Sequence, residues 1–235
     1  MRMARQAGSI FEAGTAVLFD LDDTLIDRDA ARDRFFSYLL PTYFPHLTPE
    51  EAAWADRMET MRALDRGGRG SKTAIHDYLF GGRPAMSPQA FTELMRGKLA
   101  SYASWSDGAV PLLKCLRARR HPMALVTNGS KSQRAKINAI GASVYFDTVL
   151  ISEEVGIAKP DPAIFTQAMS RLNAASDRSV FVGDSLEHDM VGARNAGMMT
   201  VYLNRSGASD VDESLCDLVV SDLRELSDRV INLEA

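Results

Sequence analysis

A short apolar segment that ends in carboxylates constrains the fold of this chain more than any other feature. Residues 16–19 read Ala-Val-Leu-Phe and are followed by Asp20, Asp22 and Asp23. An apolar run of this length is typical of a strand that is buried in a parallel sheet. Ligands of such sheets bind just beyond the carboxyl ends of the strands. If the extended conformation persists, Asp20 and Asp22 point to one side and Asp23 to the other.

Two carboxylates on one side repel each other, so they need a cation between them or a proton on one of them. The segment therefore predicts a metal-assisted site, or an acid paired with a base or nucleophile. A structural role is the alternative, because Thr24 or Asp27 could simply cap the following helix. A calcium loop of the EF-hand type is excluded. Counted from Asp20, its required Gly and Glu positions hold Leu25 and Ala31.

Residues 28–106 show helical patterns and no convincing strand. The expected helices are residues 28–40, a helix opened by Pro49, a helix capped by Ser71, and a helix from Ser87 to about Ala103. Pro41 and Pro45 are expected to stop the first of them. An all-helical block that interrupts a strand-first pattern is typical of an inserted subdomain.

From residue 107 onward, helical and strand patterns alternate. The expected strands are 123–126, 148–151, 179–182, 200–203 and 218–220. This alternation predicts an α/β fold, a Rossmann-like doubly wound parallel sheet with helices on both faces. The expected organisation is a loose tail at 1–14, a core of 15–26 with 107–235, and an all-helical insertion at 27–106.

Polar residues recur where the expected strands end. They are Asp20, Asp22, Thr127, Asn128 and Asp184, and Lys159 lies in the loop GIAKPDP. Because loops at the carboxyl edge of one sheet converge, these residues could share a pocket. Carboxylates hold Mg²⁺ through hard oxygen atoms, and a lysine offsets phosphate charge. A helix starting near Ser130 could present backbone N–H groups to phosphate oxygens. The set favours phosphoryl chemistry.

Four segments together resemble the motifs of the haloacid dehalogenase superfamily. They are FDLDDTL, VTNGS, GIAKPDPAIF and VGDSLEHDMVGARNAG, in this order and spacing. The resemblance is to the phosphatase branch, subfamily IA-like, in which a helical cap follows the first motif. It implies Mg²⁺-dependent hydrolysis of a small-molecule phosphate monoester through an aspartyl-phosphate. Nucleotides, sugar phosphates and sugar-acid phosphates are the favoured substrates.

The resemblance also implies roles for individual residues. Asp20 corresponds to the nucleophile and Asp22 to the general acid/base. Thr127 and the backbone of Asn128 would bind the phosphoryl group, and Lys159 would stabilise both the nucleophile and that group.

A metal site is implied as well. Asp184 would bind Mg²⁺ together with Asp20 and the backbone carbonyl of Asp22. Asp189 would orient Lys159 or the ligands around the metal.

The Gly-rich segment 66–72, RGGRGSK, lacks the spacing of a Walker loop and of GxGxxG. It is either a solvated basic loop or a substrate-specificity loop. In the second case Arg66, Arg69 and Lys72 would contact anionic or hydroxylated groups of the substrate.

Several other functions compete. A phosphoglycolate phosphatase or a phosphomutase would use the same core. The dehalogenase branch lacks the aspartate found here as Asp22, which favours phosphate esters. The GDSL sequence at 183–186 would make Ser185 an esterase nucleophile, but the only later histidine is His188, three residues on. A receiver-like phospho-acceptor module is compact and would lack the insertion.

Composition and charge limit the partners and the cellular location that we expect for this chain. The 235 residues carry a formal net charge of −4, which argues against nucleic acid as a partner. No apolar run approaches the roughly 20 residues of a membrane span, and the start of the chain lacks the apolar region of a secretory signal. Cys115 and Cys216 have no metal-site spacing and are expected to be reduced in a cytoplasmic protein. The sequence leaves monomer and homodimer open.

Overall fold

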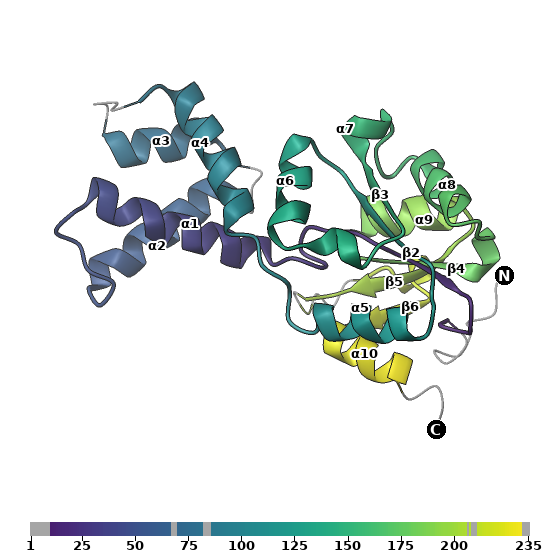
Figure 1. Cartoon of the computed structure of the whole chain (residues 1–235). Coiled ribbons are helices and arrows are strands. Elements are labelled where there is room, and N and C mark those ends of the chain that lie inside the picture. Colours follow the sequence, from purple (N-terminus) through teal and green to yellow (C-terminus); the bar gives the residue numbers. More distant parts are fainter. Residues whose placement is uncertain (1–9, 67–69, 82–85, 206, 208–210, 232–235) are drawn as a thin grey trace. The chain divides into compact units, whose positions relative to one another are not determined.

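Six parallel strands form one sheet in the order β3-β2-β1-β4-β5-β6. The computed structural model describes residues 10–66, 70–81, 86–205, 207 and 211–231. The strands are β1 Ala16–Phe19, β2 Met123–Thr127, β3 Thr148–Ile151, β4 Ser179–Gly183, β5 Met199–Leu203 and β6 Leu218–Val220. The strand order runs outward from β1 in one direction and from β4 in the other (Figure 1). The predicted doubly wound parallel sheet is confirmed.

Apolar strands without alternation explain why helices cover both faces. Every residue of β1, β2, β4 and β5 is buried, as expected for a parallel sheet. The helices of this unit are α5 Ala109–Ala118, α6 Lys131–Ala139, α7 Ser152–Val155, α8 Pro162–Arg171, α9 Val191–Asn195 and α10 Leu223–Ile231. In Figure 1, α5 and α10 lie side by side on one face, and α8 and α9 on the other. Phe165 of α8 packs edge-on against Phe181 of β4, with ring centroids 4.9 Å apart.

The chain divides into two compact units, residues 1–26 with 105–235 and residues 27–104. The second boundary therefore falls two residues before the predicted one. The helical unit contains α1 Arg28–Tyr43, α2 Ala52–Asp65, α3 Lys72–Phe80 and α4 Pro88–Ser101. Ser71 caps α3 as predicted, because its hydroxyl accepts a hydrogen bond from the backbone amide of Ala74. Ser87, the predicted start of the fourth helix, caps α4 in the same way.

Two proline predictions in the helical unit are wrong. Pro41 does not stop α1, which continues to Tyr43. Packing outweighs the lost backbone hydrogen bond there, since the ring of Tyr43 meets that of Phe80 at 4.7 Å. Pro49 does not open α2, which begins at Ala52.

The longest helix, α1, has 16 residues, and no helix in the described part of the chain is long and apolar enough to cross a membrane.

The segment before β1 also differs from expectation. Residues 1–9 lie outside the described part, but Ile10 is fully buried and Phe11 is 4% exposed. Ile10 and Phe11 are thus packed against the core, whereas residues 12–14 are exposed. Two adjacent large apolar side chains gain more from burial than a short segment loses in conformational entropy.

Candidate active site

The carboxylates after β1 stand on a tight turn. The amide of Asp20 donates to the carbonyl of Val182 at 2.9 Å, which continues the sheet pairing by one residue. Asp23 then adopts a positive φ of 60°, and the amide of Leu25 donates to the carbonyl of Leu21 at 3.0 Å. The extended conformation on which the alternation of side chains depends therefore ends at Asp20.

A buried lysine joins two carboxylates at the centre of the site. Lys159 Nζ lies 2.5 Å from Asp20 Oδ1 and 2.6 Å from Asp189 Oδ1. Lys159 is 4% exposed, Asp20 6% and Asp189 1%. Burial alone would lower the pKa of Lys159, but the carboxylates of Asp189 and Asp20 outweigh it and raise that pKa above its ordinary value. The lysine therefore carries its charge at neutral pH.

The side chain of Asn128 connects the end of β2 to the loop of Lys159 through two hydrogen bonds. Asn128 Nδ2 donates to the carbonyl of Lys159 at 2.8 Å, and the amide of Lys159 donates to Asn128 Oδ1 at 2.8 Å. Sequence analysis predicts only a backbone contact of Asn128 with phosphate. The paired hydrogen bonds fix the position from which Lys159 reaches Asp20.

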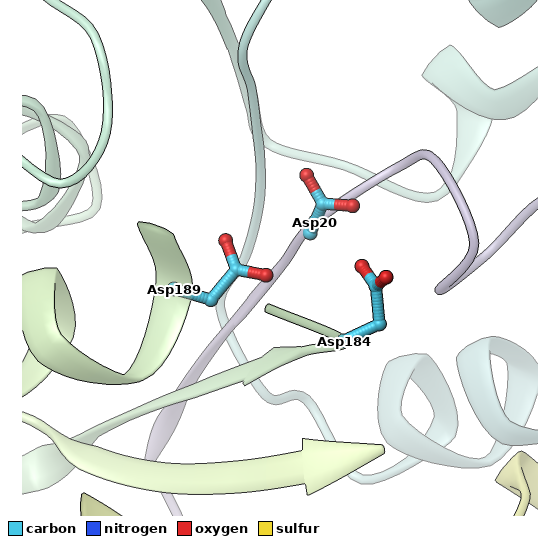
Figure 2. A group of neighbouring side chains, drawn as sticks. All are labelled: Asp20, Asp184 and Asp189. Atoms are coloured by element: carbon cyan, nitrogen blue, oxygen red, sulfur yellow. The ribbon is translucent and has the colours of Figure 1, made fainter. Parts of the chain in front are cut away.

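Asp20, Asp184 and Asp189 bring carboxylate oxygens within 4.8 Å of one another (Figure 2). Lys159 contacts two of these carboxylates, and the three carboxylates with that ammonium carry a net charge of −2 when all are ionised. Burial, with the carboxylates of Asp189 and Asp184, raises the pKa of Asp20 against the opposing ammonium of Lys159. Hard oxygen donors with excess negative charge fit Mg²⁺.

The three carboxylates are not equivalent. Asp189 uses one oxygen for Lys159 and the other for the backbone amide of Ser185, 3.1 Å away. A Cβ atom at Gly183 would lie 2.6 Å from Asp189 Cγ, so glycine is required for this close approach. Asp184 accepts from the hydroxyl of buried Thr24 at 3.3 Å. Asp20 and Asp184 are thus better placed than Asp189 to ligate a metal.

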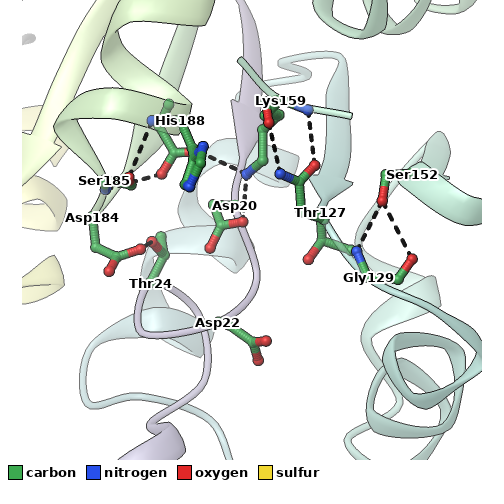
Figure 3. Close-up of polar contacts among 12 residues, drawn as sticks. Asp20, Asp22, Thr24, Thr127, Gly129, Ser152, Lys159, Asp184, Ser185 and His188 are labelled. Atoms are coloured by element: carbon green, nitrogen blue, oxygen red, sulfur yellow. Dashed lines mark hydrogen bonds and ion pairs between the residues drawn. The ribbon is translucent and has the colours of Figure 1, made fainter. Parts of the chain in front are cut away.

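The carboxylate of Asp22 belongs to a different set of contacts and points away from Lys159 (Figure 3). It pairs with Lys136 Nζ at 2.7 and 2.9 Å and accepts from Gln133 Nε2 at 3.0 Å. The hydroxyl of Thr127, fully buried, accepts from the same Gln133 nitrogen at 2.7 Å.

Sequence analysis missed Gln133, Lys136 and the contact of Thr24 with Asp184. The available signal was weak, since Gln133 and Lys136 share one helix face at i, i+3 just after a strand-end motif.

Ser185 caps a helix and has no catalytic histidine as a partner in the described part of the chain. Its hydroxyl accepts from the backbone amide of His188 at 3.1 Å (Figure 3). This is the N-cap contact of the π-helical turn Leu186–Met190. The structure therefore gives no support to an esterase triad.

The three residues of the predicted specificity loop belong to the helical unit. Arg66 is exposed and ends α2 with a positive φ of 47°. Lys72 Nζ lies 3.6 Å from Asp65 Oδ1, and Asp65 Oδ2 also pairs with Arg32 Nε at 2.9 Å. Arg69 lies outside the described residues. The charge of Lys72 is thus partly offset within its own unit.

Comparisons with known proteins agree with this geometry. The chain is 31% identical to the glyceraldehyde 3-phosphate phosphatase of Methanopyrus kandleri, over 93% of this chain and 97% of the relative. It is 34% identical to the ribulose-1,5-bisphosphate 5-phosphatase of Halopiger xanaduensis, over 92% and 99%. The crystal structure of 2-haloacid dehalogenase from Pseudomonas syringae pv. Tomato shares 26% identity over 94% and 99%, with a TM-score of 0.56. The model of the haloacid dehalogenase-like hydrolase family matches residues 17–203. The chain therefore belongs to the haloacid dehalogenase-like hydrolases.

Proposed function

We propose that this chain hydrolyses a small-molecule phosphate monoester through a phosphorylated Asp20. The observation that carries the proposal is the buried Lys159, held between Asp20 and Asp189, whose carboxylates lie close to that of Asp184. A nucleophilic carboxylate, a fixed cation and excess acidic charge are what phosphoryl transfer to an aspartate requires. The relatives named as phosphatases fit this chemistry.

The residues divide the reaction between them. With Oδ1 of Asp20 held by Lys159, Oδ2 attacks phosphorus, and the bond from phosphorus to the ester oxygen breaks. Asp22 gives a proton to the departing oxygen. In the second step Asp22 takes a proton from water, the water oxygen attacks phosphorus, and Asp20 leaves with phosphate as the product. Thr127 and the backbone of Asn128 bind the phosphoryl oxygens, and Lys159 offsets their charge.

Mg²⁺ would be held by Asp20, Asp184 and the backbone carbonyl of Asp22. When bound, it would offset negative charge on the phosphoryl oxygens. Asp189 would act through Lys159, which it already contacts.

The substrate class is a sugar phosphate, sugar-acid phosphate or nucleotide. The two phosphatase relatives are named for sugar phosphates, which puts that class first. Phosphoglycolate hydrolysis and a phosphomutase reaction remain alternatives on the same core. We also propose a cytoplasmic location, and a specificity role for Arg66, Arg69 and Lys72.

A panel of phosphate monoesters assayed with Mg²⁺ tests the proposal. Asp20→Asn should reduce turnover at least about 10⁴-fold while leaving thermal unfolding unchanged, because the amide cannot form the aspartyl-phosphate. Activity of Asp20→Asn near that of the wild type, or full activity in excess EDTA, would contradict the mechanism. Halide release from a 2-haloacid without metal would support the dehalogenase reaction instead.

A further inference from the structure

Two polar side chains on one face of α6 converge on the proposed general acid/base. Lys136 Nζ contacts both oxygens of Asp22, at 2.7 and 2.9 Å. The exposed fractions of these side chains are only 15% for Lys136 and 17% for Asp22. An ion pair shielded to this degree is more strongly coupled than a pair on the open surface.

Gln133 connects the same carboxylate to the proposed phosphate site. Its Nε2 lies 3.0 Å from Asp22 Oδ2, 2.7 Å from Thr127 Oγ1 and 3.2 Å from the carbonyl of Asn128. A carboxylate and a carbonyl only accept hydrogen bonds, so the nitrogen of the amide must face them. The hydroxyl of Thr127 accepts from Gln133, which leaves its own hydrogen available for a phosphoryl oxygen.

The backbone makes room for Gln133, which is 2% exposed. Gly129 has a φ of 141°, and a Cβ atom there would lie 2.7 Å from Gln133 Cγ. Any other residue at 129 would displace the glutamine from Asp22 and Thr127.

The contacts from α6 act on the carboxylate of Asp22 and not on its backbone. The backbone of the turn after β1 is held by its own hydrogen bonds, with Asp22 bridged to Ile26 and the amide of Asp23 donating to the carbonyl of Ile26 at 2.8 Å. Both proton transfers assigned to Asp22 require a carboxylate oxygen at one place. A displacement of about 1 Å can cost about 100-fold in rate.

We propose that Lys136 and Gln133 are positioning residues, an inference that rests on the proposed function. Lys136 holds the carboxylate of Asp22 where it serves the leaving oxygen. Gln133 holds Asp22 and Thr127 in register, so that proton transfer and phosphate binding occur in one geometry. Neither residue takes part in a bond-forming step.

The main test compares an alkyl phosphate with nitrophenyl phosphate, whose leaving group needs little help from an acid. Lys136→Met should lower kcat about 10- to 100-fold on the alkyl ester and less than about threefold on the nitrophenyl ester. Lys136→Arg keeps a cation and should recover part of the loss. Gln133→Leu should lower the rate on both esters, because it also releases Thr127.

The matched control is Arg134→Met on α6, the helix of Lys136, which removes the exposed ion pair of Arg134 with Glu154 of α7. It should behave like the wild type on both esters. In an Asp22→Asn background, Lys136→Met should cost less than about twofold further, because its target is already disabled. Equal losses on both esters, or losses that multiply with Asp22→Asn, would overturn the inference.

Failure of the proposed function can be told apart from failure of this inference. If Asp22→Asn shows the selective loss and Lys136→Met does not, only the positioning role is wrong. A second measurement does not depend on activity. Crystal structures of the wild type and Lys136→Met should show the Asp22 carboxylate in one conformation in the first and in several in the second. An unchanged Asp22 in the variant would overturn the inference whatever the enzyme hydrolyses.

Discussion

At the scale of single residues, the site is governed by the imbalance between acidic and basic groups around Lys159. One ammonium contacts two carboxylates, and a carboxylate oxygen of Asp184 lies within 4.8 Å of an oxygen of each. One lysine offsets only one of three negative charges, so a proton or a divalent cation between the carboxylates would reduce their repulsion. The raised pKa of Asp20, caused by burial and by the neighbouring carboxylates, favours the proton. The proposed Mg²⁺ is the divalent cation.

Asp184→Ala should raise the Mg²⁺ concentration needed for half-maximal activity by at least about 10-fold, because it removes one of two proposed carboxylate ligands. A Mg²⁺ titration of activity measures this. Asp189→Asn is the comparison, since Asp189 already uses both oxygens for Lys159 and Ser185. It should lower kcat more than it shifts the titration. Overlaid titrations of Asp184→Ala and the wild type would show that the ligand assignment is wrong.

At the scale of elements, hydrogen bonds from strand ends, loops and helix α6 hold the site residues in place. The end of β2 binds the loop of Lys159 through Asn128, and α6 reaches the turn after β1 through Gln133 and Lys136. The helical unit has a corresponding contact in α3. His76 is buried, with Nδ1 3.0 Å from Asp77 Oδ1 and Nε2 2.9 Å from the carbonyl of Met86.

This contact predicts a pH dependence of stability. The hydrogen bond to Asp77, then that to Met86, raises the pKa of His76 above its ordinary value against the effect of burial. A raised pKa means that the folded state binds the proton more tightly. The contribution is therefore complete below the unfolded pKa of about 6.5 and is lost as pH rises through the higher folded value. Its size is at most about 1 kcal/mol, because Asp77 is exposed.

Denaturant unfolding at several pH values between 5.5 and about 8.5 measures this dependence. His76→Gln should lower the stability throughout and flatten the decline with pH. His46→Gln is the matched control, since His46 is exposed in the same unit, and it should keep the decline. If the free energy of unfolding of His76→Gln falls with pH as steeply as that of the wild type, the decline comes from other groups.

At the scale of the whole molecule, the two units differ in what they contain. The unit of the sheet contains every residue proposed for phosphoryl transfer. These residues can recognise only the phosphate part of a substrate. Discrimination between organic parts must come from other residues, and the helical unit carries the basic loop that the sequence singles out. This assignment remains a proposal.

Replacing Arg66, Arg69 and Lys72 singly by alanine tests it. A specificity loop should lose about 10-fold in kcat/KM on the preferred ester, through lost charge-assisted hydrogen bonds, and keep its rate on nitrophenyl phosphate. Lys98→Ala, on α4 of the same unit, is the control and should leave both rates unchanged. Parallel losses on both substrates would count against a specificity role for the loop.

Elements with a local signal could be predicted from the amino-acid sequence. The buried strands could be placed to within a residue or two, because apolar runs between turn residues have few other uses. The cap at Ser71 and the start of a helix near Ser87 could be predicted for the same reason. Asp20, Lys159 and Asp184 could be assigned to one edge because the ends of parallel strands meet there. The resemblance in four motifs added roles to these residues.

Features that depend on contacts between distant segments became visible in the folded chain. Pro41 stays inside α1 and Ile10 is buried because packing outweighs local preference. In the sequence, Gln133 and Lys136 look like ordinary surface residues of a helix. In the fold, the turn after β1 brings Asp22 into contact with both, although it is 111 positions from Gln133 and 114 from Lys136 in sequence. Sequence spacing fixes which helix face a side chain occupies, but the partner on that face is chosen by the fold.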